Sequence, residues 1–173
     1  MLKILNKIRF NSRIWFFLGV VGCVSLLGMG AFFQYFMKLE PCPLCISQRL
    51  AILATGIVFL CAAIHNPAQK GTTVYGVLGA FVALCGASIS TRHVWLQHLP
   101  PEEVPECGPG LSYMLENFPL LETVKFMLSG TGDCAKVEWT MLGFSMPAWT
   151  LLAFLMLATL SVLQIWNVHG NAD

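Results

Sequence analysis

The sequence predicts an all-α membrane protein: a bundle of four transmembrane helices, with one long loop that contains a short interfacial helix. Composition points there first, because 56% of the 173 residues are hydrophobic and only 11% are charged, whereas an ordinary soluble domain is about 25% charged. The chain also contains four uncharged apolar runs, which reach or approach the ~20 residues that a helix needs to cross the hydrocarbon core. Only one connection between these runs is long. The length fits a single domain, residues 1–173.

The first two helices are predicted at 14–37 and 43–64. The first run lies between Arg13 and Lys38. It is too long for the hydrophobic region of a signal peptide and no small-residue cleavage site follows it, so we interpret it as a retained helix. The second helix has Pro43 at its first position, where the missing N–H costs nothing. It reaches a spanning length only when its polar first turns are counted.

The third and fourth helices are predicted at 71–91 and 147–166, and the long loop covers 92–146. Within this loop, Pro119 is followed by apolar residues that fall on one stripe of a helix. They are Leu120, Leu121, Val124, Met127 and Leu128. Such a short amphipathic helix would either lie flat on the membrane or cap the bundle.

The orientation follows from the basic residues around the first helix. An even number of helices puts both termini on one side of the membrane. Lys3, Lys7, Arg9 and Arg13 precede the first helix, and only Lys38 follows it directly. Because the first helix usually dominates orientation, we expect both termini in the cytoplasm and the cysteine-containing loops outside. A net charge of +1 with no basic block argues against a nucleic-acid partner.

The seven cysteines fall into two groups. Cys23, Cys61 and Cys85 lie in the middle of apolar runs, where we expect them to pack as small hydrophobic side chains. The other four all lie on the predicted outer side, in an oxidising compartment where disulfides persist. They are Cys42, Cys45, Cys107 and Cys134.

Cys42 and Cys45 form a Cys-x-x-Cys pair at the start of the second helix, where they can close a reducible disulfide. With Pro43 as the first helical residue, Cys42 would be the N-cap and Cys45 would face free backbone N–H groups. Arg49 follows Cys45 by four residues and therefore shares its helix face. Both effects favour the thiolate of Cys45, the reactive form. The alternative for Arg49 is a side chain that only extends toward the interface.

Cys107 and Cys134 lie in the long loop, where a disulfide between them would either staple the loop or exchange with a partner's thiolate. Cys107 lies in an exposed, turn-forming sequence, which favours exchange. At this stage all three pairings of the four cysteines remain open. A four-cysteine zinc site is disfavoured because it requires two close pairs, so no metal site is predicted.

The histidines argue against a bis-histidine haem, because all four lie at helix ends or beyond. His93 is placed just outside the third helix, on the same side of the membrane as Arg49. It is either a residue that hydrogen-bonds a ligand at the outer leaflet or an ordinary interfacial histidine.

Five segments closely resemble the disulfide bond formation protein B (DsbB) family of the bacterial inner membrane. They are PCPLCIxxR at 41–49, RHxxLQ at 92–97, CGPGL at 107–111, GDCAxxxWxxLG at 132–143 and MPxW at 146–149. The match covers nearly the whole chain, and its cysteine order is specific because few four-helix membrane proteins share it. Gln48 departs from the family pattern, since some members have an acidic residue there. This departure concerns the role of a carboxylate and not the cysteine chemistry.

The resemblance implies a four-helix, multi-pass enzyme of the bacterial inner membrane, a thiol:quinone oxidoreductase. It would reoxidise a periplasmic thioredoxin-fold dithiol oxidase of the DsbA type and pass the electrons to a membrane quinone, either ubiquinone or menaquinone. Arg49 and His93 would hold the quinone headgroup. Two alternatives are a paralogue that serves a specialised dithiol partner and a non-catalytic scaffold stapled by two disulfides.

The resemblance also assigns the cysteines by position. Cys107 would form the mixed disulfide with the partner, and Cys134 would be the disulfide mate of Cys107. Cys42 would exchange with this loop pair. Cys45 would be the thiolate that meets the quinone ring.

Overall fold

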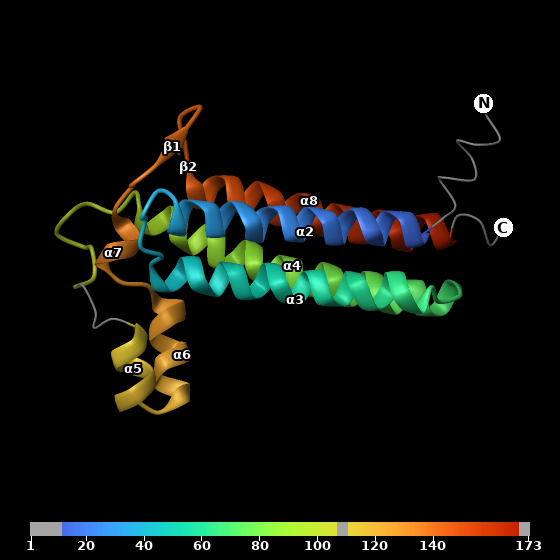
Figure 1. Ribbon diagram of the computed structural model, residues 1–173, viewed down its shortest axis with the longest axis horizontal. Helices are drawn as coiled ribbons and strands as arrows, with labels where there is room; N and C mark the ends of the chain where they lie inside the picture. Colours follow the sequence, from blue (N-terminus) through green and yellow to red (C-terminus); the bar gives the residue numbers. More distant parts are fainter. Residues whose placement is uncertain (1–11, 107–110, 170–173) are drawn as a thin grey trace.

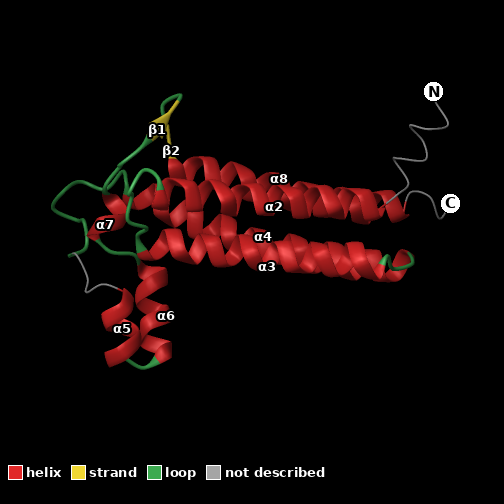
Figure 2. Cartoon of the chain, in the orientation of Figure 1, coloured by secondary structure: helices red, strands yellow, loops and turns green. Residues whose placement is uncertain are grey.

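Four long helices lie side by side as an elongated bundle in the computed structural model, which describes residues 12–106 and 111–169 (Figure 1). They are α2 (Ser12–Tyr35), α3 (Pro43–His65), α4 (Gln69–Leu96) and α8 (Met146–His169). Helix α2 packs on α3, α3 on α4, and α4 on α8. The start of α2 and the end of α8 lie at the same end of the bundle. The short elements all gather at the opposite end, which we call the loop end (Figure 2).

All four long helices are long and apolar enough to cross a membrane. Many of their large apolar side chains point away from the bundle, among them Phe17, Val24, Ile57, Phe81 and Met156, which are all about half exposed or more. A surface of this kind requires lipid as its solvent. The predicted fold class, an all-α membrane protein with four spanning helices, is therefore confirmed.

Helix α4 corrects one predicted boundary. It was expected to end at Thr91, but it continues to Leu96, so Arg92 and His93 belong to its last turns. The connection to α8 therefore covers 97–145 and not 92–146. The first charge after an apolar run marks where the hydrocarbon ends and not where the helix ends. No glycine or proline lies between Thr91 and Pro100, so the backbone hydrogen bonds of α4 continue into the interface.

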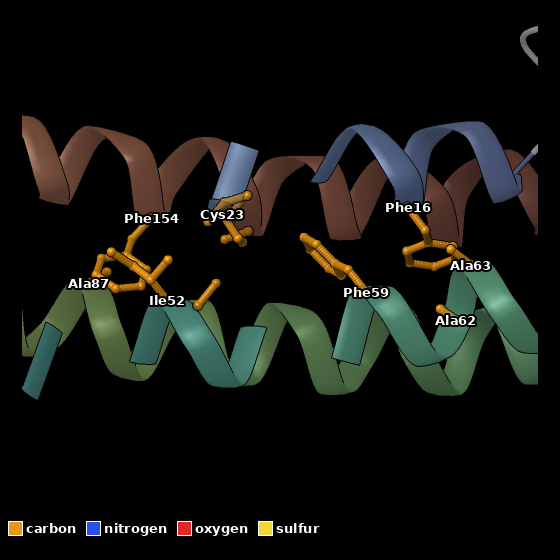
Figure 3. Close-up of a cluster of buried hydrophobic side chains, with 11 residues drawn as sticks. Phe16, Cys23, Ile52, Phe59, Ala62, Ala63, Ala87 and Phe154 are labelled. Atoms are coloured by element: carbon orange, nitrogen blue, oxygen red, sulfur yellow. The ribbon is translucent and has the colours of Figure 1, made fainter. Parts of the chain in front are cut away.

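The bundle core is built from aromatic rings set against small residues (Figure 3). Phe59 of α3 packs against Gly79 of α4, and a Cβ at that glycine would lie 2.6 Å from the ring. Phe154 of α8 fills the space left by Gly86 of α4 in the same way. Because lipid offers no hydrophobic driving force between helices, such close packing is what holds transmembrane helices together.

The three mid-membrane cysteines do not share one environment. Cys23 is buried in the core, as predicted. Cys61 and Cys85 are exposed on the outside of the bundle, so the prediction that they pack inside was wrong. Both residues occur on faces of their helices that neighbouring helices leave uncovered, and the uniformly apolar runs give no periodicity that separates lipid-facing from core positions.

Three short helices and one hairpin form the loop end: α5 (Leu111–Asn117), α6 (Leu120–Ser129), α7 (Gly132–Ala135), β1 (Thr140–Met141) and β2 (Phe144–Ser145). The two strands pair antiparallel through a tight turn in which Gly143 has φ +81°. Helix α6 runs across the bundle axis (Figure 1), and most of its apolar stripe is exposed while Thr123 is buried. This arrangement fits a helix lying flat on the membrane and not a cap over the bundle.

Candidate functional site

A cavity of about 580 Å³ opens at the loop end, between the ends of α2, α3 and α4 and the segment that leads into α8. Its volume lies in the range of small-molecule sites, roughly 300–1,000 Å³. Its lining residues are Phe33, Leu39, Glu40, Pro41, Cys42, Pro43, Cys45, Ile46, Arg49, His93, Gln97, Thr131, Asp133, Lys136, Glu138, Trp139, Met146 and Pro147. The predicted site residues of α3 and α4 therefore share one cavity.

The Cys-x-x-Cys pair is held by the start of α3. Cys42 is the N-cap of this helix and Pro43 is its first residue, as the sequence predicted. The Cys45 backbone N–H donates to the Cys42 Sγ at 3.4 Å, and the two sulfurs lie 3.2 Å apart. Both are free thiols, half-buried at the cavity. The cap geometry thus holds the two sulfurs at a distance from which a disulfide can form.

Cys134 joins this pair from helix α7. Its side chain is fully buried, and its sulfur hydrogen-bonds with the Cys42 thiol. That hydrogen bond lowers the pKa of Cys134 to about 6 against the opposing effect of burial, and backbone hydrogen bonds from Thr131 and Leu44 act in the same direction. The pKa of Cys42 is raised, first because it hydrogen-bonds to Cys134. The shared proton therefore stays on Cys42, and Cys134 is the thiolate of this contact.

The approach of α7 depends on the backbone just before it. Gly130 has φ +79°, and a Cβ there would lie 2.6 Å from Leu96 Cδ1, so only glycine fits without strain. The Gly132 N–H donates to the carbonyl of Glu106 at 3.4 Å. Cys107, the next residue, lies outside the described residues. The structure therefore brings together three of the four predicted cysteines.

Arg49 is held sideways against α2. One guanidinium nitrogen donates to the carbonyl of Gly30 at 2.8 Å, and the other donates to the side-chain oxygen of Gln34. A Cβ at Gly30 would lie 3.1 Å from the Arg49 Nε, so a glycine leaves the space that the guanidinium needs. The side chain does not simply extend to the interface. Sequence reasoning missed Gln34, whose only signal is a polar residue near the end of an apolar run.

His93 is 2% exposed and lies between the cysteine pair and Gln48. Its Nε2 is 3.7 Å from the Cys42 Sγ, and its Nδ1 is 3.2 Å from the Gln48 amide nitrogen. With that amide donating to Nδ1, the ring proton sits on Nε2 and points toward sulfur. His93 is therefore no ordinary interfacial histidine. Gln48, which the sequence analysis noted only as a departure from the family pattern, is the residue that orients the His93 imidazole.

The site combines three thiols in contact, one fixed cation and one oriented imidazole. The chemistry available to such a set is thiol–disulfide exchange, with charge stabilisation beside Cys45. The cavity also has an aromatic wall, where the ring centroids of Phe33 and Trp139 are 4.9 Å apart. This wall connects α2 with the segment that follows α7, and gives a flat apolar ligand a surface to lie against.

Comparison with known proteins gives a consistent match. The profile of the family described as "Disulfide bond formation protein DsbB" matches residues 12–164. The chain is 64% identical over 159 residues to the disulfide bond formation protein B of Methylococcus capsulatus, covering 92% of this chain and 97% of that protein. It is 51% identical over 164 residues to the protein of the same name from Nitrosococcus oceani, covering 95% and 97% of the two chains. The corresponding protein of Hahella chejuensis is 53% identical over 145 residues, covering 84% and 88%.

Proposed function

The chain belongs to the DsbB family of disulfide bond formation proteins, and we propose that it is a thiol:quinone oxidoreductase. It is a multi-pass membrane protein with a role in disulfide bond formation. In our proposal it reoxidises a periplasmic thioredoxin-fold dithiol oxidase of the DsbA type and passes the electrons to a membrane quinone. Its termini then lie in the cytoplasm and the loop end lies on the periplasmic side of the inner membrane.

The first exchange transfers the partner's electrons into the loop. A partner thiolate attacks Cys107 of a Cys107–Cys134 disulfide, and this step forms the mixed disulfide and releases Cys134 as a thiolate. Backbone hydrogen bonds from Thr131 and Leu44 lower the pKa of Cys134 whatever the state of Cys42, and this supports the assignment because a thiol with a low pKa is a good leaving group. The partner's second thiolate then displaces Cys107, so the partner leaves with its disulfide restored.

The second exchange runs through the contact between Cys134 and Cys42. The Cys134 thiolate attacks the Cys42 sulfur of a Cys42–Cys45 disulfide, a new S–S bond forms, and the electron pair leaves on Cys45. The packing of Cys42 against the buried cluster that contains Cys134 supports this route, because it brings the two residues together. The released Cys45 thiolate is stabilised by the N-terminal end of α3 and by the charge of Arg49 on the same helix face.

The residues of the cavity fit a quinone headgroup. The aromatic wall of Phe33 and Trp139 and the donors of Arg49 suit a flat ring with two carbonyl oxygens. When bound, a quinone supplies an acceptor for two electrons and two protons. Arg49 is anchored on α2 in advance, so it would stabilise negative charge on a bound quinone without reorganising. His93 carries a proton on the nitrogen that faces Cys42.

A single observation carries the proposal: a loop cysteine meets the Cys-x-x-Cys pair at the wall of a cavity that also holds a fixed arginine. The test is the reduction of a soluble quinone analogue by the purified protein in the presence of a reduced DsbA-type partner, followed by quinone absorbance. Cys45→Ser should abolish it. Cys61→Ser, on the outside of the bundle, is the matched control and should turn over normally. Full turnover by Cys45→Ser would refute the proposal.

A further inference from the structure

Three potential metal ligands from two helices converge at the cysteine pair. The Cys42 sulfur lies 3.2 Å from the Cys45 sulfur and 3.7 Å from Nε2 of His93, and all three atoms lie within 4.8 Å of one another. In a tetrahedral zinc site, Zn–S bonds of about 2.3 Å and Zn–N bonds of about 2.0–2.1 Å set neighbouring ligand atoms roughly 3.5–3.8 Å apart. Small side-chain rotations therefore convert this cluster into zinc-binding geometry.

We propose that the reduced protein binds one soft divalent cation, Zn²⁺ or Cd²⁺, through Cys42, Cys45 and His93. Two thiolates and an imidazole are a ligand set that suits such ions. The spacing of the cysteines along the chain gives no sign of the site, because its third ligand comes from another helix, 51 residues after Cys42. Cys134 is the candidate for the fourth ligand, since Cys42 packs against the buried cluster that contains it.

Gln48 provides the supporting contact that a metal-bound histidine requires. Such a histidine normally donates its second ring N–H to an oxygen. The Gln48 side-chain amide lies at hydrogen-bond distance from Nδ1 of His93, and both residues are buried. A half-turn of this amide presents its oxygen to an Nδ1–H, which leaves Nε2 free for the metal. Gln48 can therefore support His93 both with and without a bound ion.

Binding depends on the redox state of the pair. When the ion binds, Cys42 and Cys45 each lose a proton and form a bond to the metal, with no change in oxidation state. A Cys42–Cys45 disulfide has no thiolate to offer, so the oxidised protein lacks two of the three ligands. The binding site itself stands on geometry alone. The consequence for turnover rests on the proposed function: metal-held sulfurs cannot re-form their disulfide, so the ion inhibits the enzyme in its reduced state.

The test uses the full chain, purified without quinone, either reduced or oxidised at its cysteines. Each form is incubated with Zn²⁺ alone, passed through a desalting column, and its zinc is counted with a chromogenic chelator. We expect one ion per reduced chain and none per oxidised chain. Cd²⁺ should give sulfur-to-metal charge-transfer absorbance in the reduced form. Equal zinc in both forms, or none in either, would overturn the proposal.

Matched variants separate this site from adventitious binding. Loss of an outer-shell partner lowers metal affinity roughly 10–100-fold, and His93→Ala, which removes a direct ligand, should lower zinc affinity by at least as much. His98 is an exposed histidine at the same end of the bundle, so His98→Ala should leave zinc affinity unchanged. Gln48→Leu should weaken binding by about 10–100-fold without removing a ligand, which keeps the test valid if His93→Ala does not fold. Affinity that resists both substitutions would place the ion elsewhere and refute the site.

A turnover assay distinguishes this inference from the proposed function. If both hold, Zn²⁺ stops quinone reduction and a chelator restores it. If zinc binds the reduced chain but no quinone is reduced under any condition, the binding site stands and the proposed function fails. If quinone is reduced normally at saturating Zn²⁺, the expected inhibition is refuted and the function stands, while the zinc count alone decides the site.

Discussion

The anchoring of Arg49 by Gln34 gives the sharpest test of how the cavity works. We consider Gln34→Leu, which removes the side-chain oxygen that accepts from the guanidinium and leaves only the Gly30 carbonyl. A hydrogen bond to a charged group contributes about 1.5–3 kcal/mol. Because both side chains are only partly buried, we take the lower end of this range. At 1.4 kcal/mol per factor of ten, the freed arginine should raise the quinone KM about tenfold.

The design is a double-mutant cycle with Arg49→Met. If Gln34 acts only through Arg49, then Gln34→Leu should have almost no further effect in the Arg49→Met background, because the interaction is already lost. Quinone-analogue reduction at saturating partner provides KM and kcat for each variant. Gln69→Leu is the matched control: an exposed glutamine at the opposite end of the bundle, where the same change should leave KM unaltered.

Two results would contradict this reasoning. An unchanged KM in Gln34→Leu would show that the anchor does not matter for binding. A further tenfold increase in quinone KM when Gln34→Leu is added to Arg49→Met would show that Gln34 contacts the quinone or shapes the cavity independently of the arginine.

Two further predictions concern the thiolate and the core. Because the pKa of Cys134 is lowered from 9.0 to about 6, its thiolate should persist at neutral pH and disappear only as the pH falls through about 6. In Cys42→Ala the titration midpoint of Cys134, followed by its ¹³Cβ chemical shift, should rise toward 9. An unmoved midpoint would disprove the role of the Cys42 hydrogen bond. Gly86→Ala should lower the free energy of unfolding by about 1–3 kcal/mol because its Cβ would collide with the ring of Phe154. Gly28→Ala, where a Cβ meets nothing within 4 Å, should leave thermal stability in detergent unchanged, and equal melting temperatures for both variants would argue against close packing as the source of bundle stability.

Local physics explains why much of the fold could be predicted from the sequence. A spanning helix needs only an apolar run of sufficient length, so the four spans follow from composition along the chain. The start of α3 is equally local, because a cap residue and a first-turn proline determine it within four residues. The shared face of Cys45 and Arg49 follows from helical periodicity alone. These features need no knowledge of what packs against them.

The limits of that reasoning appear where a helix meets the interface. The apolar run of α4 ends at Thr91, but the helix continues to Leu96 and carries His93 into a buried position. Hydropathy reports the solvent around a helix and not its hydrogen bonds, so it cannot locate this end. The same limit applies to Cys61 and Cys85, whose exposure depends on which faces the neighbouring helices cover.

What the sequence by itself determined was the set of spans, the capped Cys-x-x-Cys pair and, through family resemblance, the roles expected of its cysteines. Only the tertiary structure decided which groups meet: Cys134 with Cys42, Gln34 with Arg49, and Gln48 with His93. The physical reason is the separation along the sequence of the residues that interact. A cap or an apolar run is complete within a few neighbouring residues, whereas each of these contacts joins segments that come together only when the bundle packs.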